Sequence, residues 1–301
     1  MHLNAGRAPA PAALWWKSMS RRAPSPGKRR DEVDPTLQQA LIALRSGRAA
    51  EAERLASGVL RSRGASVMAT QILGEALLLQ GRAQEAVDRL EKPARRSGEP
   101  GTETLLAMAL DAAGRSAEAM DQLRSATTRR PVFPLAFLKL GEQLGELGRF
   151  EEAIAVLEEG LALAPDGVGL RVGLGFLHLR RNDRASARAL FLAVLADAPE
   201  RHDATVGLGR VMVADGEHAS AVEQFRRALA MRPGDAATLI ELGKCQLEMG
   251  ARRQGEATLR AAAREAPRLA ILSILALSAA PHGRFFLRRS AAFRFLSVEM
   301  S

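Results

Sequence analysis

Residues 137–165 read FLKLGEQLGELGRFEEAIAVLEEGLALAP and contain one complete copy of a pattern that recurs along the chain. The copy closes with a proline, and a closing proline returns every 34 residues. These prolines are Pro131, Pro165, Pro199, Pro233 and Pro267. A fixed period of this length indicates small, similar units stacked one on another, and argues against a globular enzyme domain.

Each part of this copy predicts a local structure. Leu140, Leu144 and Leu147 follow the spacing of one helix face. Gly148 then ends the helix at a position where φ is expected to be positive, which glycine adopts without a Cβ clash. A second helix begins at once, with acids near the positive end of its dipole. The copy therefore predicts a helix, a tight turn and a second helix.

Seven copies share the turn position. Their turn residues are Gly47, Gly81, Gly114, Gly148, Asn182, Gly216 and Gly250. Five copies carry a Leu-Gly pair in the first helix, at residues 73–74, 140–141, 174–175, 208–209 and 242–243. In the second helix a small residue is followed four positions later by a large apolar one, as in Ala153 and Leu157. We expect the small residues to let two helices approach closely and the large one to fill the space between neighbouring hairpins.

The pattern resembles the tetratricopeptide repeat, which reads W-x2-L-G-x2-Y, then A-x3-F, then P. The resemblance covers roughly residues 33–268 and implies an all-α, right-handed α-solenoid of about seven helix-turn-helix units with a C-terminal capping hairpin. The chain departs from the family pattern in three ways. Tyrosine is absent, Gln39-Ala40 stands where Leu-Gly is expected in the first copy, and Ala107 replaces glycine in the third.

These observations predict three regions. Residues 1–32 form a disordered, basic leader rich in Pro and Ala, residues 33–268 hold seven repeats, and residues 269–301 form capping or docking helices. Trp15 and Trp16 of the leader leave open a weak contact with a membrane surface or a partner. The apolar run beside them is too short and too proline-flanked for an export signal, which favours a cytoplasmic location.

The C-terminal segment admits more than one interpretation. Its apolar run from Leu269 to Ala280 is much shorter than a membrane-spanning helix. Phe285, Phe286, Phe293 and Phe295 follow, interleaved with arginines. We expect a degenerate eighth hairpin that covers the open end of the array. The alternatives are a docking segment for a partner, or a basic-aromatic patch for single-stranded nucleic acid or anionic lipid.

The net charge of +9 is concentrated at the ends of the chain. Residues 1–34 carry seven basic and three acidic side chains, whereas residues 35–268 carry 32 basic and 30 acidic ones. A nucleic-acid-binding surface needs basic groups clustered along one face. The array is close to neutral, so we do not expect it to bind nucleic acid.

The sequence gives little support to catalysis. The five histidines have no second His or Cys at metal-ligand spacing, and the chain contains no Gly-rich phosphate loop, nucleophile elbow or zinc signature. His178 falls where the repeat family has a packing aromatic, which favours an interior imidazole. Cys245 is the single cysteine and is expected to be a buried, inert thiol. We predict a protein that is not an enzyme and that uses no metal or cofactor.

In the family that the chain resembles, the first helix of each hairpin lines a concave groove. Mapping the first helices onto this sequence implies an acidic end, to which Glu75, Glu142 and Glu146 belong. It also implies an apolar and basic end, for which the candidates are Phe176, Arg180, Val206, Arg210, Val213, Ile240, Lys244 and Leu247. A peptide with hydrophobic anchors and a carboxylate would suit this second end. The alternative is that these charges are merely solvated.

The favoured interpretation is a non-enzymatic scaffold that binds a protein or peptide partner in the groove of the repeats. One alternative is an accessory subunit of an enzyme system, such as a sulfotransferase or a glycosyltransferase, because such repeats often precede catalytic domains. An envelope or secretion assembly factor is a further alternative, against which the missing export signal counts.

Overall fold

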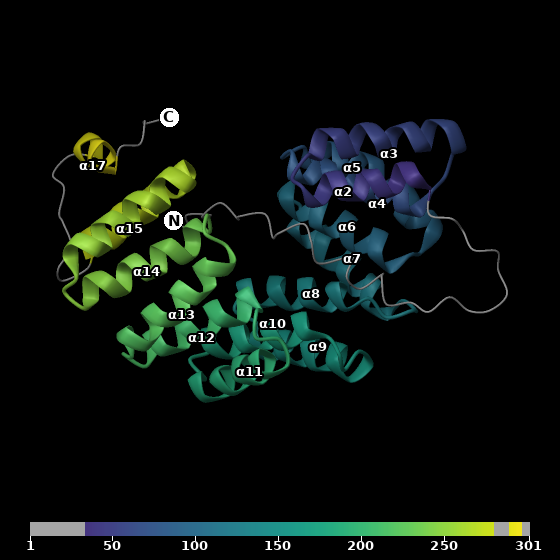
Figure 1. The fold of residues 1–301 in the computed structure, drawn as a ribbon. Helices are drawn as coiled ribbons and strands as arrows, with labels where there is room; N and C mark the ends of the chain where they lie inside the picture. Colours follow the sequence, from purple (N-terminus) through teal and green to yellow (C-terminus); the bar gives the residue numbers. More distant parts are fainter. Residues whose placement is uncertain (1–33, 280–288, 297–301) are drawn as a thin grey trace. The chain divides into compact units, whose positions relative to one another are not determined.

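The structure is a computed structural model that describes residues 34–279 and 289–296, and these residues are helical apart from short connections (Figure 1). The predicted leader lies outside the described residues. The chain divides into two compact units, one ending at Leu170 and one beginning at Arg171, and each is described by itself. Among the described residues no helix is both long enough and apolar enough to cross a membrane.

The described residues form sixteen α-helices and one short 3-10 helix. In the first unit these are α2 (Pro35–Arg45), α3 (Ala49–Arg63), α4 (Val67–Leu79), α5 (Ala83–Ser97), α6 (Pro100–Ala112), α7 (Ser116–Thr128), α8 (Pro134–Glu146) and α9 (Phe150–Leu163). Helix α10 (Val168–Arg180) begins at the boundary. The second unit continues with α11 (Arg184–Asp197), α12 (His202–Ala214), α13 (His218–Met231), α14 (Ala236–Glu248), α15 (Arg252–Glu265), η1 (Pro267–Leu269), α16 (Ala270–Ala279) and α17 (Arg289–Leu296).

Within each unit the helices pack in sequential antiparallel pairs. The first helix of a pair contacts the second, as α6 contacts α7 and α12 contacts α13. The second helix then contacts the first helix of the next pair, and successive first helices also touch, as in α4 with α6 and α12 with α14. The all-α fold predicted from the repeat pattern is therefore confirmed, in the form of stacked helical hairpins.

The turn between the two helices of each hairpin has the conformation that the sequence predicts. The six turn glycines have φ between 72° and 82°, and Asn182 takes the same left-handed region at 63°. At Gly148 the chain closes with two backbone hydrogen bonds, from Gly148 N to Gly145 O and from Arg149 N to Leu144 O, both 3.0 Å. These bonds satisfy carbonyls at the end of α8 and reverse the chain directly into α9.

The glycine of each Leu-Gly pair lies against the large apolar residue of its own hairpin. A Cβ atom added at Gly141 would lie 2.8 Å from Leu157, and one added at Gly209 would lie 2.7 Å from the Phe225 ring. Such distances are shorter than real side-chain contacts, so both positions require glycine for the two helices to pack this closely. The expected close approach is confirmed.

The last two helices pack against the end of the second unit. Ala276 and Leu277 of α16, together with Phe293 and Leu296 of α17, are buried in one apolar cluster with residues of α14 and α15. The Arg260 guanidinium lies 4.6 Å from the ring centroid of Phe295. Covering α15 in this way is what a capping hairpin must do. Phe285 and Phe286 lie outside the described residues.

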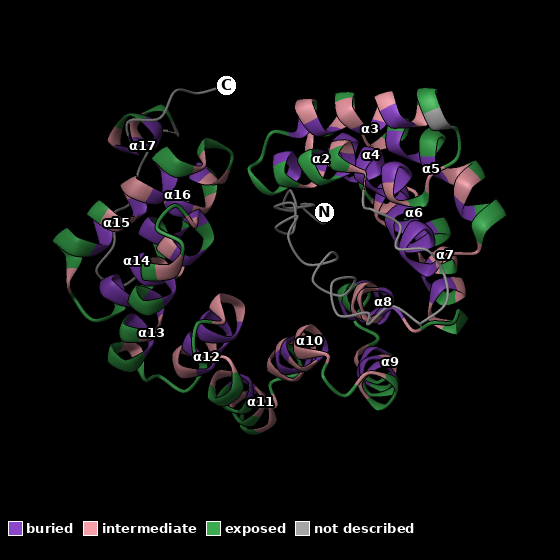
Figure 2. Cartoon of the chain, turned by 45° about the vertical axis from the view of Figure 1, so that its right-hand side comes forward, coloured by how far each residue is buried: buried purple, intermediate pink, exposed green. Residues whose placement is uncertain are grey.

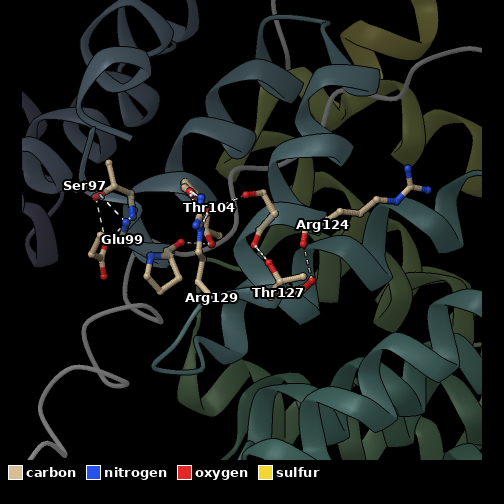
Figure 3. Close-up of polar contacts among 11 residues, drawn as sticks. Ser97, Glu99, Thr104, Arg124, Thr127 and Arg129 are labelled. Carbon is tan, nitrogen blue, oxygen red and sulfur yellow. Dashed lines mark hydrogen bonds and ion pairs between the residues drawn. The ribbon is translucent and has the colours of Figure 1, made fainter. Parts of the chain in front are cut away.

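In the first unit, partly buried polar contacts link α4 and the end of α7 to α6, and Figure 3 shows the part of them around Glu99 and Arg129. The Glu99 carboxylate caps α6 by accepting a hydrogen bond from Thr102 N at 2.8 Å, and it also accepts one from Gln71 Nε2 at 2.7 Å. The Glu103 side chain is only 4% exposed, and its carboxylate accepts a hydrogen bond from Arg129 Nη2 at 2.9 Å. Because a buried carboxylate is costly without a partner, Arg129 holds this junction together.

We expect Arg129→Ala to lower the midpoint of thermal unfolding by roughly 5 °C, because the buried Glu103 carboxylate loses its ionic partner. Arg115→Ala is the matched control, since Arg115 pairs with the exposed Glu118 at 2.7 Å and exposed pairs contribute little. Thermal unfolding followed by circular dichroism measures both variants. Equal midpoints for the two variants would show that the Glu103 pair has no special role.

Candidate partner-binding groove

The first helices of the second unit present side chains at equivalent positions. Phe176 of α10, Arg210 of α12 and Lys244 of α14 each follow the previous one by 34 residues. Phe176 and Arg210 are partly exposed, and Lys244 is exposed. Their equal spacing on parallel, stacked helices makes them one stripe, which we call the basic stripe.

Arg210 is the central residue of the basic stripe. Its guanidinium carbon lies 5.8 Å from the ring centroid of Phe176, within the range of a cation–π contact. Its Nη2 atom is 3.8 Å from Glu241 Oε1, which is longer than a hydrogen bond. Arg210 Nε is buried and, within the described part of the chain, has no hydrogen-bond partner, whereas the side chain as a whole is 41% exposed. The guanidinium is thus held against Phe176, and its ionic contact with Glu241 is long.

Lys244 lies near the second oxygen of the same carboxylate. Its Nζ atom is 3.5 Å from Glu241 Oε2. Two cations therefore share one carboxylate. The single negative charge of Glu241 cannot balance the positive charges of both Arg210 and Lys244. A partly desolvated pair of cations with an excess positive charge is suited to binding a carboxylate.

Three predicted groove residues are buried in the core, and for them the prediction is corrected. Val206 belongs to the apolar cluster around Phe225, and Ile240 belongs to the cluster around Leu259. Leu247 is fully buried, and a Cβ atom on Gly255 would lie 2.7 Å from it. These side chains fill the spaces between helices and leave nothing exposed for a ligand. Val213 is partly buried against the same cluster as Val206.

The remaining predicted residues are exposed but do not all lie in the second unit. Arg180 is exposed at the end of α10. Glu142 and Glu146 are exposed on α8 of the first unit, where Glu142 accepts a hydrogen bond from Lys139 Nζ at 2.7 Å. The predicted acidic and basic ends thus belong to different units, and the candidate binding surface is the first-helix face of the second unit.

Helix α4 of the first unit buries the position that Arg210 and Lys244 occupy in the second unit. Residues 69–77 of α4 are all buried, and in Figure 2 α4 and α6 are predominantly coloured as buried. Glu75, a predicted member of the acidic end, is 6% exposed, and burial raises the pKa of its carboxyl to about 8. Glu75 is therefore placed inside the first unit, where the carboxyl is mostly protonated near neutral pH.

The reactive side chains of the second unit have structural roles. The Nδ1 atom of His178 lies 3.0 Å from Asp183, whose other carboxylate oxygen accepts a hydrogen bond from Ser186 N and caps α11. Cys245 is buried, as predicted, and burial raises the pKa of its thiol to about 11. Among the described residues no group of His, Cys, Asp and Glu is arranged to hold a metal ion. The basic stripe is equipped for binding and carries no nucleophile paired with a base.

Sequence reasoning missed one feature of this face. Glu241, which joins Arg210 to Lys244, was not among the predicted residues, although its place one turn before Lys244 puts it on the same face. Ile271 and Leu275 of α16 are exposed. They belong to the apolar segment for which the sequence left both a capping and a docking role open.

Comparison with known proteins identifies the family. The sequence model of the tetratricopeptide repeat matches residues 37–99, 104–168 and 172–236, and a second model of the same repeat matches residues 212–277. These matches span most of the chain, which therefore belongs to the tetratricopeptide repeat family. Proteins of this family typically mediate protein–protein interactions and are generally non-catalytic. No curated protein matches the chain.

Several solved structures share the fold. The crystal structure of the APC/C hetero-tetramer Cut9-Hcn1 matches with a TM-score of 0.65 and 17% identity, over 82% of this chain and 49% of that one. A tetratricopeptide repeat protein from Parabacteroides merdae matches with a TM-score of 0.61 and 16% identity, over 79% and 97% of the two chains. The human IFIT1 dimer with PPP-AAAA matches with a TM-score of 0.62 and 15% identity, over 76% and 58%. This chain spans about half the length of the Cut9-Hcn1 chain, and the likeness concerns the fold alone.

Proposed function

We propose that this protein is a non-enzymatic, cytoplasmic scaffold that binds a protein or peptide partner on the first-helix face of its second unit. The observation that carries the proposal is the basic stripe. Phe176, Arg210 and Lys244 occupy the same position in three successive repeats and remain at least partly exposed. A repeated, exposed set of this kind offers an extended partner several contacts in a row.

The chemistry of the stripe favours a partner that carries carboxylates. Arg210 is oriented by Phe176 and is 41% exposed, and Lys244, which is 46% exposed, shares the Glu241 carboxylate with Arg210. Because the guanidinium is already positioned, less side-chain freedom is lost when an acidic group binds. No metal or cofactor is required for such recognition.

The proposal is tested with the double variant R210E/K244E. We expect it to weaken capture of partners from the native host by at least about tenfold relative to the unaltered chain, because each cation is replaced by a repelling charge. The variant is expected to fold, since Arg210 and Lys244 are 41% and 46% exposed, but to lose on the order of 1 kcal/mol, because both new carboxylates lie near Glu241. Affinity co-purification read by quantitative mass spectrometry measures the capture.

The matched control is R226E/R253E, which makes the same change in charge on the second helices α13 and α15, where both arginines are exposed. We expect this control to retain the partners of the unaltered chain. If R210E/K244E retains them equally well while both variants unfold at the same temperature, the basic stripe is not the binding site.

A further inference from the structure

Helix α16 has a second face that does not pack against the other described residues of the C-terminal hairpin. Ala270, Ala276 and Leu277 are buried toward α14 and α15. Ile271 and Leu275, one helical turn apart, are 42% and 56% exposed. They are two of the few large apolar side chains in the described residues that remain this exposed, and they lie on one side of the same helix.

The repeat register places this apolar pair beside the basic stripe. Arg210 of α12 reaches Glu241 of α14, and the two residues are separated by 31 positions. The same separation leads from Lys244 of α14 to Leu275 of α16. Since α14 packs against α16 as α12 packs against α14, Leu275 is the counterpart of Glu241 in the repeat register, and we expect it to lie toward Lys244. Ile271 precedes Leu275 by one turn.

We infer that this combined face binds an acidic amphipathic segment of a partner protein. Two apolar side chains of the segment cover Ile271 and Leu275, and its carboxylates contact Lys244 and Arg210. This inference rests on the proposed function and adds the chemistry of the partner. Helix α16 then has two roles: one side covers the last repeat, and the other supplies the hydrophobic anchor site.

The charges of the neighbouring helices set the direction of the bound segment. Glu248 is exposed one turn after Lys244 on α14 and would repel a carboxylate there. Glu241 is engaged by the two cations. The acids of the segment therefore belong toward Arg210, and its apolar side chains belong on α16. A basic segment would meet Arg210 and Lys244 directly and is disfavoured.

The test uses a library of random peptides displayed on phage and selected on the full chain. We expect the enriched peptides to carry at least two large apolar residues together with acids. Synthetic versions are then titrated by fluorescence anisotropy against the unaltered chain, I271S/L275S and R210E/K244E. We expect each double variant to weaken binding by about tenfold or more.

The matched control for the apolar pair is L163S/L192S, which removes two leucines that are 40% and 50% exposed on α9 and α11. This control should bind the peptides as the unaltered chain does. Thermal unfolding should show that I271S/L275S remains folded, since both side chains are largely in solvent. If it unfolds at a clearly lower temperature, Leu275→Glu alone, tested at a temperature where it is folded, replaces it.

The outcomes separate this inference from the proposed function. Peptides lost on R210E/K244E but retained on I271S/L275S overturn the inference and leave the proposed function standing. Enriched peptides that are basic, or that have no apolar residues, also overturn it. If no enriched peptide binds either double variant more weakly than the unaltered chain, both the inference and the proposed function are overturned. Sedimentation velocity completes the test, because a dimer of the free chain that I271S/L275S abolishes would make α16 a contact between copies and contradict the inference.

Discussion

Phe191→Ala is expected to destabilise the second unit by about 3–5 kcal/mol, because it empties the space between two hairpins. The Phe191 ring is fully buried and lies between two glycines, Gly175 of its own hairpin and Gly207 of the next. A Cβ atom on Gly207 would lie 2.4 Å from the ring, which shows how closely the backbone of α12 approaches it. The ring also meets Phe176 edge to face, with centroids 5.1 Å apart.

The loss would extend beyond one hairpin, because Phe191 joins α10, α11 and α12 and each repeat depends on its neighbours for a core. Removing the ring leaves a cavity that the backbones of α10 and α12, held by their other packing contacts, cannot close. Urea denaturation of the full chain, followed by circular dichroism, measures the change. Leu192→Ala is the control, since its side chain is 50% exposed, and it should cost well under 1 kcal/mol. Similar costs for both substitutions would show that Phe191 does not hold the hairpins together.

Glu75→Gln is expected to stabilise the protein increasingly as the pH rises from about 4.5 to about 8. Burial raises the pKa of the Glu75 carboxyl to about 8, so the folded protein holds a proton that the unfolded chain releases near its ordinary value of 4.5. The folded state therefore binds more protons within this range, and the free energy of unfolding falls as the pH increases. The stability that the protonated Glu75 carboxyl contributes is fully present below pH 4.5 and is lost as the pH passes through 8.

The amide that replaces the carboxyl in Glu75→Gln does not ionise. The free energy of unfolding of this variant therefore does not fall with pH for this reason. A shift of one pKa unit corresponds to about 1.4 kcal/mol, so the stability difference between variant and unaltered chain should grow by on the order of 4 kcal/mol across the range. Urea denaturation at a series of pH values measures it. Glu85→Gln is the control: Arg82 lowers the pKa of this exposed carboxyl below 4.5, so its stability difference should stay nearly constant between pH 4.5 and 8 and change only at lower pH. A Glu75→Gln difference that is independent of pH would show that the carboxyl is ionised in the folded state.

The two units illustrate how one repeat pattern supports different surfaces. In α4 and α6 of the first unit most residues are buried, and polar side chains such as Gln71 and Glu103 make hydrogen bonds inside the unit. The position that carries Arg210 in α12 and Lys244 in α14 is Glu75 in α4, and Glu75 is 6% exposed whereas both cations remain partly in solvent. At this position a partner can therefore reach a charged side chain on α12 and α14 but not on α4.

The local structure of this protein was predictable from its sequence. The seven turns occur at the predicted positions because a reversal with φ near 75° requires glycine or asparagine, and such residues recur at a fixed interval. Most second helices end two residues before the repeated prolines, as α9 does at Leu163 and α11 at Asp197, because proline restricts the residue before it. The close pairs, such as Gly141 with Leu157, were likewise predicted from residue size and spacing.

Which equivalent positions face solvent was decided only by the tertiary structure. The repeat register predicted that Val206, Ile240 and Leu247 line the groove together with Arg210 and Lys244. These three apolar side chains are buried instead. Exposure at a given helix position depends on how far the neighbouring helix approaches, and that distance follows from the sizes of side chains on three helices at once. The sequence by itself therefore determined the hairpins and their order, since these depend on local backbone preferences. The placement of Glu241 between two cations, and of Ile271 and Leu275 at the surface, came from packing between repeats.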